Sequence, residues 1–314
     1  MKRFVKKILN RTSFTVLLTA LLFSCASSSL LTDSLGVLGG VAELTGHGAT
    51  AKGLQAASDI SKAAEDITPE NEYYIGRSVA ASLLTHYKVY NGSFLLESYV
   101  NKICAVLVEN SEYPELFNGY HVKLIKSDEV NAFSTSGGHI FITLGLLKCA
   151  QNEDALAAVV AHEIAHIQLH HSLNSIKKSR RTAALISTAD ATATVVGKQA
   201  GVKNMSEIAS AMAEVVGGAV DELINKGFSK EQEFEADKLA LTLMSDAGYD
   251  SSAMLEMLSV MKKNQNGSSS GAYKTHPSPD ARIKKVESAL SGNKRSGFNR
   301  EKRKSRFTAA AGNL

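Results

Sequence analysis

Acidic residues are absent from the first 24 positions, and no apolar run long enough to cross a bilayer occurs after them. Those first positions hold five bases, followed by the apolar run FTVLLTALLF. At about ten residues, this run is half the length that a transmembrane helix needs, but it suits the apolar core of a signal peptide. We therefore expect residues 1–24 to be a signal peptide.

Cysteine is scarce, with three in the chain, and the first of them directly follows the signal-like segment. The stretch Leu22-Phe23-Ser24-Cys25 resembles a bacterial lipobox, in which a small residue precedes a cysteine that becomes the lipidated N-terminus, although Phe23 is bulkier than usual there. The alternative is a plain signal peptide with a chance cysteine. The resemblance implies lipidation of Cys25 and, with Ala26 after it, the periplasmic face of the outer membrane, while the Ser-, Gly-, Ala- and Thr-rich composition of residues 25–67 indicates a tether.

The other two cysteines, Cys104 and Cys149, would then lie in an oxidising compartment. They could form a disulfide there. Two buried thiols are the alternative, because nothing in the sequence fixes the distance between them.

Charge is unevenly distributed behind a formal net value of +4. Residues 25–290 carry 23 bases against 30 acids, whereas residues 291–314 carry 7 bases and 1 acid. An acidic body argues against nucleic-acid binding by the folded part. The tail over residues 291–314 has no apolar periodicity and is expected to be disordered. No internal repeat is visible.

Helical and extended patterns alternate between the tether and the tail. A helix is expected to start at Pro69, because Thr68 can cap it and Pro suits the first helical position. Val122 and Leu124 alternate with polar neighbours, and GGHIFIT is rich in β-branched and aromatic residues after a Gly-Gly turn, which predicts β structure. Further helices are expected over 93–109, from about 153, over 229–247 and 251–263, and up to about 290. Residues 180–227 could be an amphipathic surface or a mobile flap.

Four of the nine histidines lie in the stretch AVVAHEIAHIQLHH, residues 158–171. His162-Glu163-Ile164-Ala165-His166 is an H-E-x-x-H motif on an expected helix. Histidines four apart share one helical face, so both can reach one metal ion, and Glu163 lies beside the ion's open position. A polar helix face with incidental histidines is the alternative. It would have to desolvate two imidazoles and a carboxylate among alanines and valines.

A catalytic zinc ion needs a third protein ligand. The segment SKEQEFEADKLA supplies Glu233 and Asp237 at helical i, i+4 spacing. Glu233 can bind the ion, and Asp237 can accept a hydrogen bond that orients a ligand imidazole. Read alone, the segment is a charged helix face.

The motifs AHEIAH and EFEAD together resemble the HtpX-like and prenyl-protease-type gluzincins, family forty-eight of the metallopeptidases. VNAFSTSGGHIFITLGLL resembles the family's segment before the zinc helix, and THPSPDARI resembles its H-P-x-x-x-x-R motif. The resemblance covers residues 68–290. It implies an α+β, mainly helical, zincin-like domain with a small sheet whose edge strand faces the active-site cleft.

The resemblance also implies roles for single residues, first a zinc site with one Zn²⁺ per chain. His162, His166 and Glu233 would bind the zinc ion, Glu163 would be the general base and Asp237 would orient His162. His276 would take the ion's remaining position or face the substrate, or it is a loop histidine held by neighbouring prolines, while Arg282 would tie that loop to the site. Apart from the resemblance, His170 continues the helical face of His162 and His166 and is expected to lie near the ligands or to pack, and His171 is left as structural.

For the substrate, the resemblance implies that Asn131 and the strand at Gly138, His139 and Ile140 bind extended peptide main chain to main chain. The expected function is a zinc metalloendopeptidase that acts on extended or misfolded envelope proteins in quality control. The alternative is a chaperone-like assembly factor for outer-membrane proteins, with little or latent proteolysis gated by His276. The sequence names no specific substrate and no oligomeric state.

Overall fold

The structure, a computed structural model, describes residues 67–178, 216–264, 276, 279–291 and 299–312. Cys25, the signal segment, the tether and most of 180–227 lie outside these residues, so the predicted domain boundaries remain predictions. The elements, in order, are α4 (Pro69–His86), α5 (Phe94–Glu109), β1 (His121–Ile125), β2 (Ala132–Thr135), β3 (His139–Thr143), α6 (Leu144–Cys149), α7 (Glu153–Gln168), η1 (Glu222–Lys226), α10 (Lys230–Asp246), α11 (Ala253–Asn264), α13 (Pro279–Leu290) and α14 (Arg300–Ala311).

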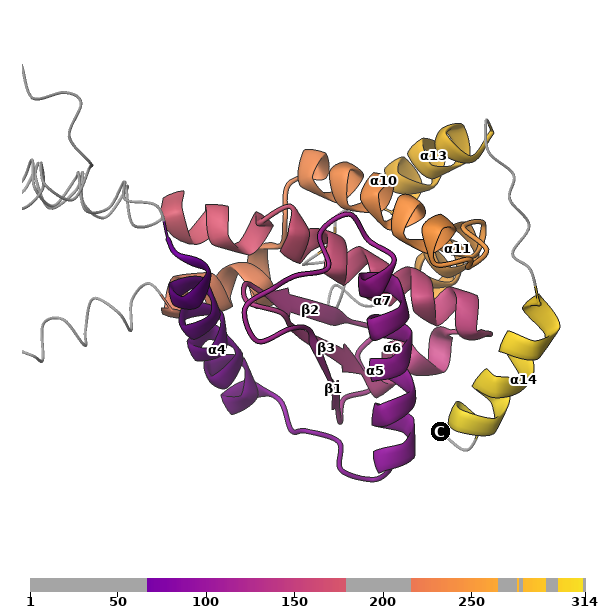
Figure 1. The fold of residues 1–314 in the computed structure, drawn as a ribbon, viewed down its shortest axis with the longest axis horizontal. Helices are drawn as coiled ribbons and strands as arrows, with labels where there is room; N and C mark the ends of the chain where they lie inside the picture. The colour runs from indigo at the N-terminus through magenta and orange to yellow at the C-terminus, as the bar shows by residue number, and fades with distance from the viewer. Residues whose placement is uncertain (1–66, 179–215, 265–275, 277–278, 292–298, 313–314) are drawn as a thin grey trace, which may run out of the picture. The chain divides into compact units, whose positions relative to one another are not determined.

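The three strands form one sheet in the order β1-β3-β2. β1 is parallel to the central strand β3, and β2 is antiparallel to it. Gly137 and Gly138 make the turn between β2 and β3 with φ values of 74° and 91°, a conformation that favours glycine. The predicted fold, mainly helical with a small sheet, is confirmed (Figure 1).

Helix starts follow the capping residues of the sequence. The Thr68 side chain accepts from the Asn71 N–H, with Pro69 at the first helical position, as predicted. Asn152 caps α7 by accepting from the Ala155 N–H, and Ser229 starts α10 with a reciprocal capping box. These caps fix where the two helices that carry the H-E-x-x-H and EFEAD motifs begin.

Helix α7 is the centre of the core. Every residue from Glu153 to Ile167 is buried, which requires contact on all sides. Its neighbours are α10, α11 and α5 and the strand β2, which lies nearer to α7 than the other two strands (Figure 1). Alanines at 155, 157, 158, 161 and 165 allow these elements to approach closely. The helix is therefore held rigidly, which suits a helix that positions reactive groups.

Helix α14 corrects the prediction for the tail. Residues 291–314 were expected to be disordered, but Arg300–Ala311 form a helix that packs against α7 and α5. Phe307 and Ala311 are buried, and Arg303 reaches the buried carboxylate of Asp154 at 2.9 Å. The prediction rested on the lack of apolar periodicity in the tail, whereas several of its arginines pair with acids on the body.

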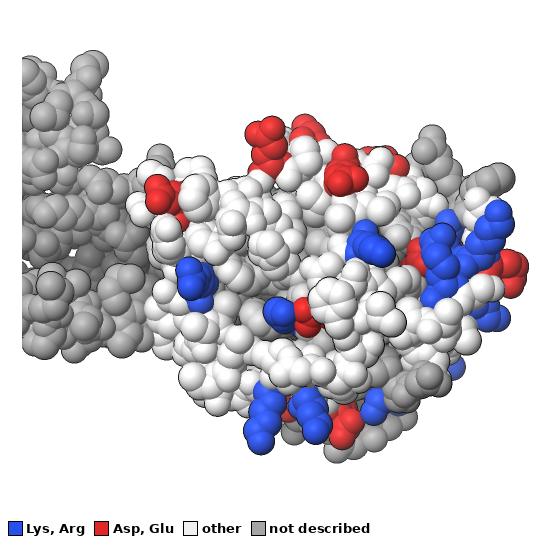
Figure 2. Space-filling view, turned by 60° about the horizontal axis from the view of Figure 1, so that its bottom comes forward, with Lys and Arg blue, Asp and Glu red and all other residues white. Residues whose placement is uncertain are grey.

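The acids that meet α14 lie at the starts of α7 and α11. Arg306 forms two hydrogen bonds to Glu153, of 2.9 and 2.5 Å, and Arg300 pairs with Glu256. In Figure 2 basic side chains gather at the end of the molecule where α14 lies, with acidic side chains between them. The opposite charges of body and tail therefore meet in ion pairs.

Cys104 is buried and Cys149 is half-buried, and neither forms a disulfide in the structure. This agrees with the alternative of two thiols. None of the helices in the described ranges combines the length and apolar character that a bilayer crossing requires.

Candidate metal centre

Two imidazoles of α7 face each other at the middle of the core. His162 and His166 lie one turn apart, their Nε2 atoms are 3.0 Å apart, and both side chains are buried. Two nitrogens this close to each other share one proton or one cation between them, because two lone pairs would repel. The predicted placement of both histidines on one helical face agrees with this geometry.

Helix α10 brings Glu233 to the same point. Glu233 Oε2 lies 3.5 Å from His162 Nε2, and Glu233 Oε1 lies 3.4 Å from His166 Nε2. The Glu233 side chain is fully buried, at 0% exposure. Burying a carboxylate costs free energy unless opposite charge compensates it, and here the Arg282 guanidinium supplies part of that charge, 3.0 Å from Oε2.

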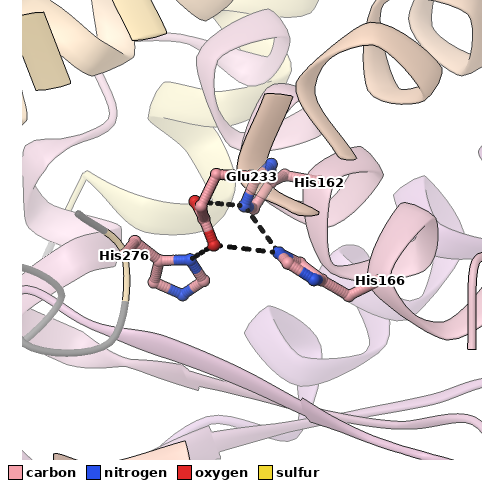
Figure 3. A group of neighbouring side chains, drawn as sticks. All are labelled: His162, His166, Glu233 and His276. Atoms are coloured by element: carbon pink, nitrogen blue, oxygen red, sulfur yellow. Dashed lines mark hydrogen bonds and ion pairs between the residues drawn. The ribbon is translucent and has the colours of Figure 1, made fainter. Parts of the chain in front are cut away.

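His276 adds a fourth donor from a different part of the chain. Its Nδ1 lies 2.8 Å from Glu233 Oε1, and its side chain is buried. Donor atoms of all four residues lie within 4.8 Å of one another, and Figure 3 shows the side chains converging on one space.

The four residues fit a zinc ion. Zinc binds imidazole nitrogen and carboxylate oxygen in a tetrahedron, whose donors lie about 3.3 Å apart. The distances among His162, His166 and Glu233 run from 3.0 to 3.5 Å. In addition, the buried Glu163 Oε2 has no hydrogen-bond partner among the described residues, which leaves it able to hold a water molecule.

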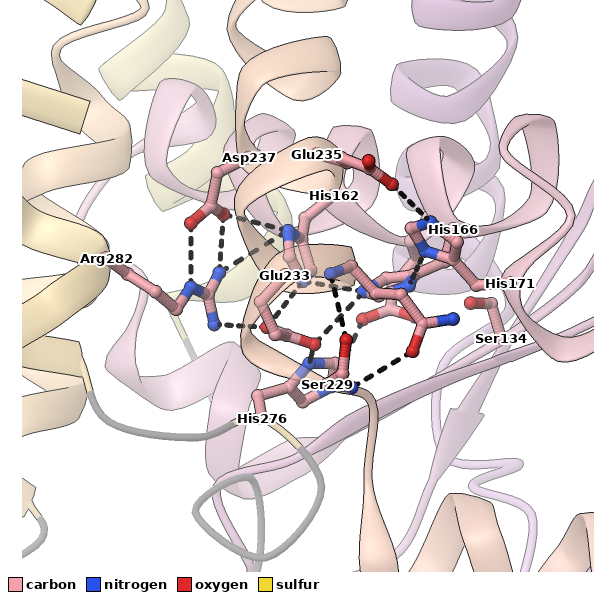
Figure 4. A network of polar contacts seen from close by, with 12 residues as sticks. Ser134, His162, His166, His171, Ser229, Glu233, Glu235, Asp237, His276 and Arg282 are labelled. Carbon is pink, nitrogen blue, oxygen red and sulfur yellow. Dashed lines mark hydrogen bonds and ion pairs between the residues drawn. The ribbon is translucent and has the colours of Figure 1, made fainter. Parts of the chain in front are cut away.

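Asp237 and Arg282 surround the outer side of His162. Asp237 Oδ1 lies 3.0 Å from His162 Nδ1, so it can fix the ring with Nε2 directed at the other donors. Arg282 donates two hydrogen bonds to Asp237, at 2.8 and 2.6 Å, and its Nη1 lies 3.0 Å from Glu233 Oε2 (Figure 4). Arg282, expected only to tie a loop to the site, thus contacts two carboxylates of the site itself.

The outer side of His166 is occupied by residues that sequence reasoning did not place there. His171 Nδ1 lies 2.8 Å from His166 Nδ1, and its Nε2 lies 3.5 Å from Glu235 (Figure 4). The ring of Phe228 stacks on His166, with 4.2 Å between the ring centroids. Glu235 lies in the same charged segment as Glu233. Its place in that segment was the only feature of the sequence that could have indicated a position near the site.

His170 does not extend the face of the two ligand-like histidines. Helix α7 ends at Gln168, and His170 has a left-handed backbone with φ of 54°. Its ring lies 3.3 Å from Glu72 and is half exposed. We expected His170 near the ligands because we continued the helical spacing past Gln168, and this expectation is wrong because the helix ends there. The turn after α7 brings His171 inward instead.

The charges of the site follow from burial and from Arg282. Burial and the Arg282 guanidinium lower the pKa of His162, but hydrogen bonds to Asp237 and Glu233 outweigh them and raise it to about 9. Burial raises the pKa values of Asp237 and Glu233, yet Arg282 and the histidines bring both below their ordinary range. Burial lowers the pKa of His166. At neutral pH the carboxylates of Asp237 and Glu233 are therefore charged. A bound cation would displace the proton of His162.

The edge strand near the site is β2 rather than β3. The predicted substrate strand at Gly138, His139 and Ile140 is wrong, because β3 pairs with β1 on one side and β2 on the other and has no open edge. The His139 ring stacks on Tyr73 instead, with centroids 5.4 Å apart. β2 lines a small cavity together with Glu163 and His276, so the expected edge strand at the cleft is present at Ala132–Thr135.

The hydrogen-bond pattern shows which groups of β2 face outward. Thr143 donates its N–H to the Asn131 carbonyl, and bonds alternate along an antiparallel ladder, so Ala132 and Ser134 direct their main-chain groups away from β3. Ser172 Oγ donates to the Ser134 carbonyl from that outer side, in agreement. Asn131, predicted to bind substrate, is buried at the start of this edge.

Comparison with known proteins identifies the family. The model of Peptidase family M48 matches residues 95–290. A beta-barrel assembly-enhancing protease from Yersinia pestis is 27% identical over 70% of this chain and 46% of its own length. The mitochondrial metalloendopeptidase OMA1 from Schizosaccharomyces pombe is 31% identical over 61% of this chain and 52% of its own length. The chain thus spans about half the length of these relatives.

Proposed function

Because the chain belongs to Peptidase family M48, a family of metalloproteases, we propose that it is a zinc-dependent endopeptidase of the cell envelope. The observation that carries the proposal is the convergence of His162, His166 and Glu233 on one point, with Glu163 one residue from the first ligand. These three side chains would hold one zinc ion per chain, and His276 would add a fourth donor.

The chemistry needs one acid–base group beside the ion. When bound, zinc lowers the pKa of water toward about 7 and polarises the carbonyl of the scissile bond. Glu163, buried beside this position, takes the proton from the attacking water and returns it to the leaving amine. Asp237, itself paired with Arg282, holds the His162 ring in place through the reaction.

The substrate would align along β2. The outward Ala132 carbonyl and Ser134 N–H offer one acceptor and one donor to an extended peptide beside Glu163. Hydrogen bonds to the main chain do not depend on which side chains the substrate carries, but they require an extended backbone. They therefore favour extended or unfolded polypeptide over folded protein. This preference, the signal-like N-terminus with Cys25 and the names of the bacterial relatives together support a role in quality control of envelope proteins, at the periplasmic face of the outer membrane.

A Glu163→Gln substitution tests the proposal. We expect the purified protein to contain about one zinc per chain and to cleave casein, and the variant to keep its zinc while losing cleavage by about 1000-fold or more. Glu231→Gln, an exposed change on α10, is the control and should retain activity. Full activity in Glu163→Gln would refute the role given to Glu163.

The arrangement of His276 supports a second candidate, a latent protease that acts mainly as an assembly factor for outer-membrane proteins. His276 lies 2.8 Å from Glu233, and its Nε2 lies 3.8 Å from Glu163, so in this position it occupies space that water and substrate need. In the latent form, His276→Ala raises proteolysis. A loss of proteolysis in that variant would assign His276 to substrate binding or catalysis, and rescue of a deletion strain by Glu163→Gln would favour the assembly role.

A further inference from the structure

Two large apolar side chains are exposed to solvent at the start of α5. Phe94 and Leu95 are 83% and 80% exposed, more than any other large apolar residue that the structure describes. We call these two residues the apolar tip. In Figure 1 the chain from α4 to α5 runs along the lower edge of the molecule, and α5 begins there. Exposed apolar side chains of this size are unfavourable in water, so two neighbouring ones indicate a surface that meets a partner.

The chain around the apolar tip is rich in lysine. Residues 87–102 and 121–126 hold four lysines and one acid. Lys126 donates its N–H to the Lys88 carbonyl at 2.7 Å, so these two lysines are adjacent where the connection from α4 to α5 passes the end of β1. Both are exposed, and neither forms an ion pair with a described residue. Positive charge without a partner therefore lies close to the apolar surface.

The one acid in this stretch is already neutralised. Glu97 lies one turn after Phe94, and its Oε1 is 2.6 Å from Lys123 Nζ of β1. Lys102 is exposed two turns after Leu95, on the same face of α5. Four lysines and one glutamate leave the stretch with a net charge of +3.

The acids that follow β1 have partners as well. Asp128 Oδ1 lies 3.4 Å from Lys148 Nζ, and Glu129 accepts a hydrogen bond from the Tyr87 hydroxyl at 3.0 Å. The positive charge around the apolar tip is therefore available to an anionic partner.

Charge and chain length favour a lipid bilayer as that partner. Aromatic and leucine side chains enter the boundary between headgroups and acyl chains, and lysines beside them are attracted to anionic headgroups. About 40 residues lie between Cys25, the predicted site of lipidation, and the start of α4. An extended chain of that length reaches at most about 140 Å. The membrane that this lipid would enter is thus within reach of the apolar tip.

We propose that the apolar tip and its surrounding lysines dock the domain on the surface of an anionic phospholipid bilayer. The sheet order β1-β3-β2 places β2 at the edge opposite to β1, so docking through the end near β1 leaves the proposed substrate edge free. This inference goes beyond the proposed function and does not depend on the zinc chemistry.

Sedimentation with vesicles tests the docking. The protein is the mature chain, residues 25–314, with Cys25→Ser so that it carries no lipid. We expect it to bind vesicles of phosphatidylethanolamine and phosphatidylglycerol, to bind phosphatidylcholine vesicles at least about tenfold more weakly, and to be released by high salt. Phe94→Ser and Leu95→Ser should each weaken binding to the anionic vesicles by about tenfold. Lys88→Gln and Lys126→Gln should each weaken it by about fivefold.

Tyr113→Ser is the matched control. Tyr113 is 61% exposed and follows the other end of α5, so this variant also loses an exposed aromatic ring and should bind vesicles as the parent chain does. Absence of vesicle binding, or an equal loss in Tyr113→Ser and Phe94→Ser, would overturn the proposal. If the chain ignores vesicles but forms dimers that Leu95→Ser separates, the apolar tip is a contact between copies and the lipid proposal fails.

Cleavage of casein in the absence of lipid separates this proposal from the proposed function. Vesicle binding by a chain that does not cleave casein would support the docking surface and count against the peptidase. Cleavage by a chain that binds no vesicles would support the peptidase and remove the docking surface.

Discussion

The contact between Asp237 Oδ1 and His162 Nδ1, at 3.0 Å, orients one of the donors of the candidate metal centre. Carboxylates in this position fix the tautomer of the imidazole and strengthen it as a ligand. Asp237→Asn should therefore lower zinc affinity by about 10- to 100-fold, measured by competition with a chromogenic chelator.

An exposed acid of the same helix provides the control for that experiment. Asp246→Asn lies at the far end of α10 and should leave zinc affinity unchanged. Equal affinities for all three proteins would show that the Asp237 contact does not act on the ligand.

Cys104 gives a pH dependence whose sign can be derived. Burial raises the pKa of its thiol from 9.0 to about 12, so the folded protein keeps the proton where the unfolded chain loses it. Stability from this group is present below pH 9 and is lost as the pH rises from 9 toward 12, by about 1.4 kcal/mol per pH unit. Urea midpoints measured from pH 8 to pH 11 should fall more steeply for the native sequence than for Cys104→Ala. Parallel curves would contradict the derivation.

Residue spacing predicted the inner part of the site and failed for its surroundings. H-E-x-x-H spacing places His162 and His166 on one face of a helix, and EFEAD places Glu233 and Asp237 on one face of α10. That these two faces meet was implied by the family resemblance and not by the spacing. The contact of His171 with His166 depends instead on the end of α7 at Gln168 and on the turn after it. No spacing rule predicts such a turn.

Strand β2 invites a test at the level of its backbone. Because the Ser134 N–H points away from β3, Ser134→Pro removes a donor that a peptide would use, while the pairing with β3 is kept. We expect kcat/KM for casein to fall about tenfold, the worth of one hydrogen bond, with zinc content unchanged.

Ser134→Ala is the matched control for the proline variant. It retains the N–H, and the buried Ser134 Oγ has no hydrogen-bond partner among the described residues, so activity should be retained. If Ser134→Pro cleaves as well as the native protein, the substrate does not pair with β2.

Helix α14 contributes to stability through a buried ion pair. Arg303 and Asp154 are 7% and 0% exposed, so Arg303→Ala leaves a carboxylate buried without its partner. Removing one partner of such a pair costs about 3 kcal/mol or more, which urea unfolding will measure. Lys302→Ala, exposed on the same helix, should change stability by less than about 0.5 kcal/mol. Similar midpoints for both variants would mean that α14 is not docked in solution.

The elements were easier to predict than their arrangement. Capping residues and periodicity gave the helices α4, α5, α7, α10, α11 and α13 and the β structure around residues 120–143, but neither α6 nor η1. These features do not predict the order of the strands, because a pattern of alternating burial does not specify which strands pair. The prediction therefore placed the central strand β3 at the edge of the sheet. Helix α14 was missed because its buried face consists of Arg303, Phe307 and Ala311, one of which is a base.

Metal removal tests the whole domain, since the donors come from α7, α10 and the segment at His276. A ligand that binds the folded state alone adds about 4 kcal/mol of stability at 1000 times its Kd. A chelator should therefore lower the melting temperature by about 10 °C, and zinc should restore it. His166→Ala should melt at the same temperature with and without zinc. A melting temperature that ignores the chelator would argue against a bound ion.

The donors of the candidate centre are spread along the chain, from His162 to His276. The start of α7 forms ion pairs with α14, another distant segment. Contacts between such distant segments form late, after most of the polypeptide is available to fold. During synthesis, the H-E-x-x-H helix thus emerges well before Glu233, which would be needed to hold an ion. A growing chain consequently has no assembled centre, and the four donors come together only once the segments at Glu233 and His276 have joined α7.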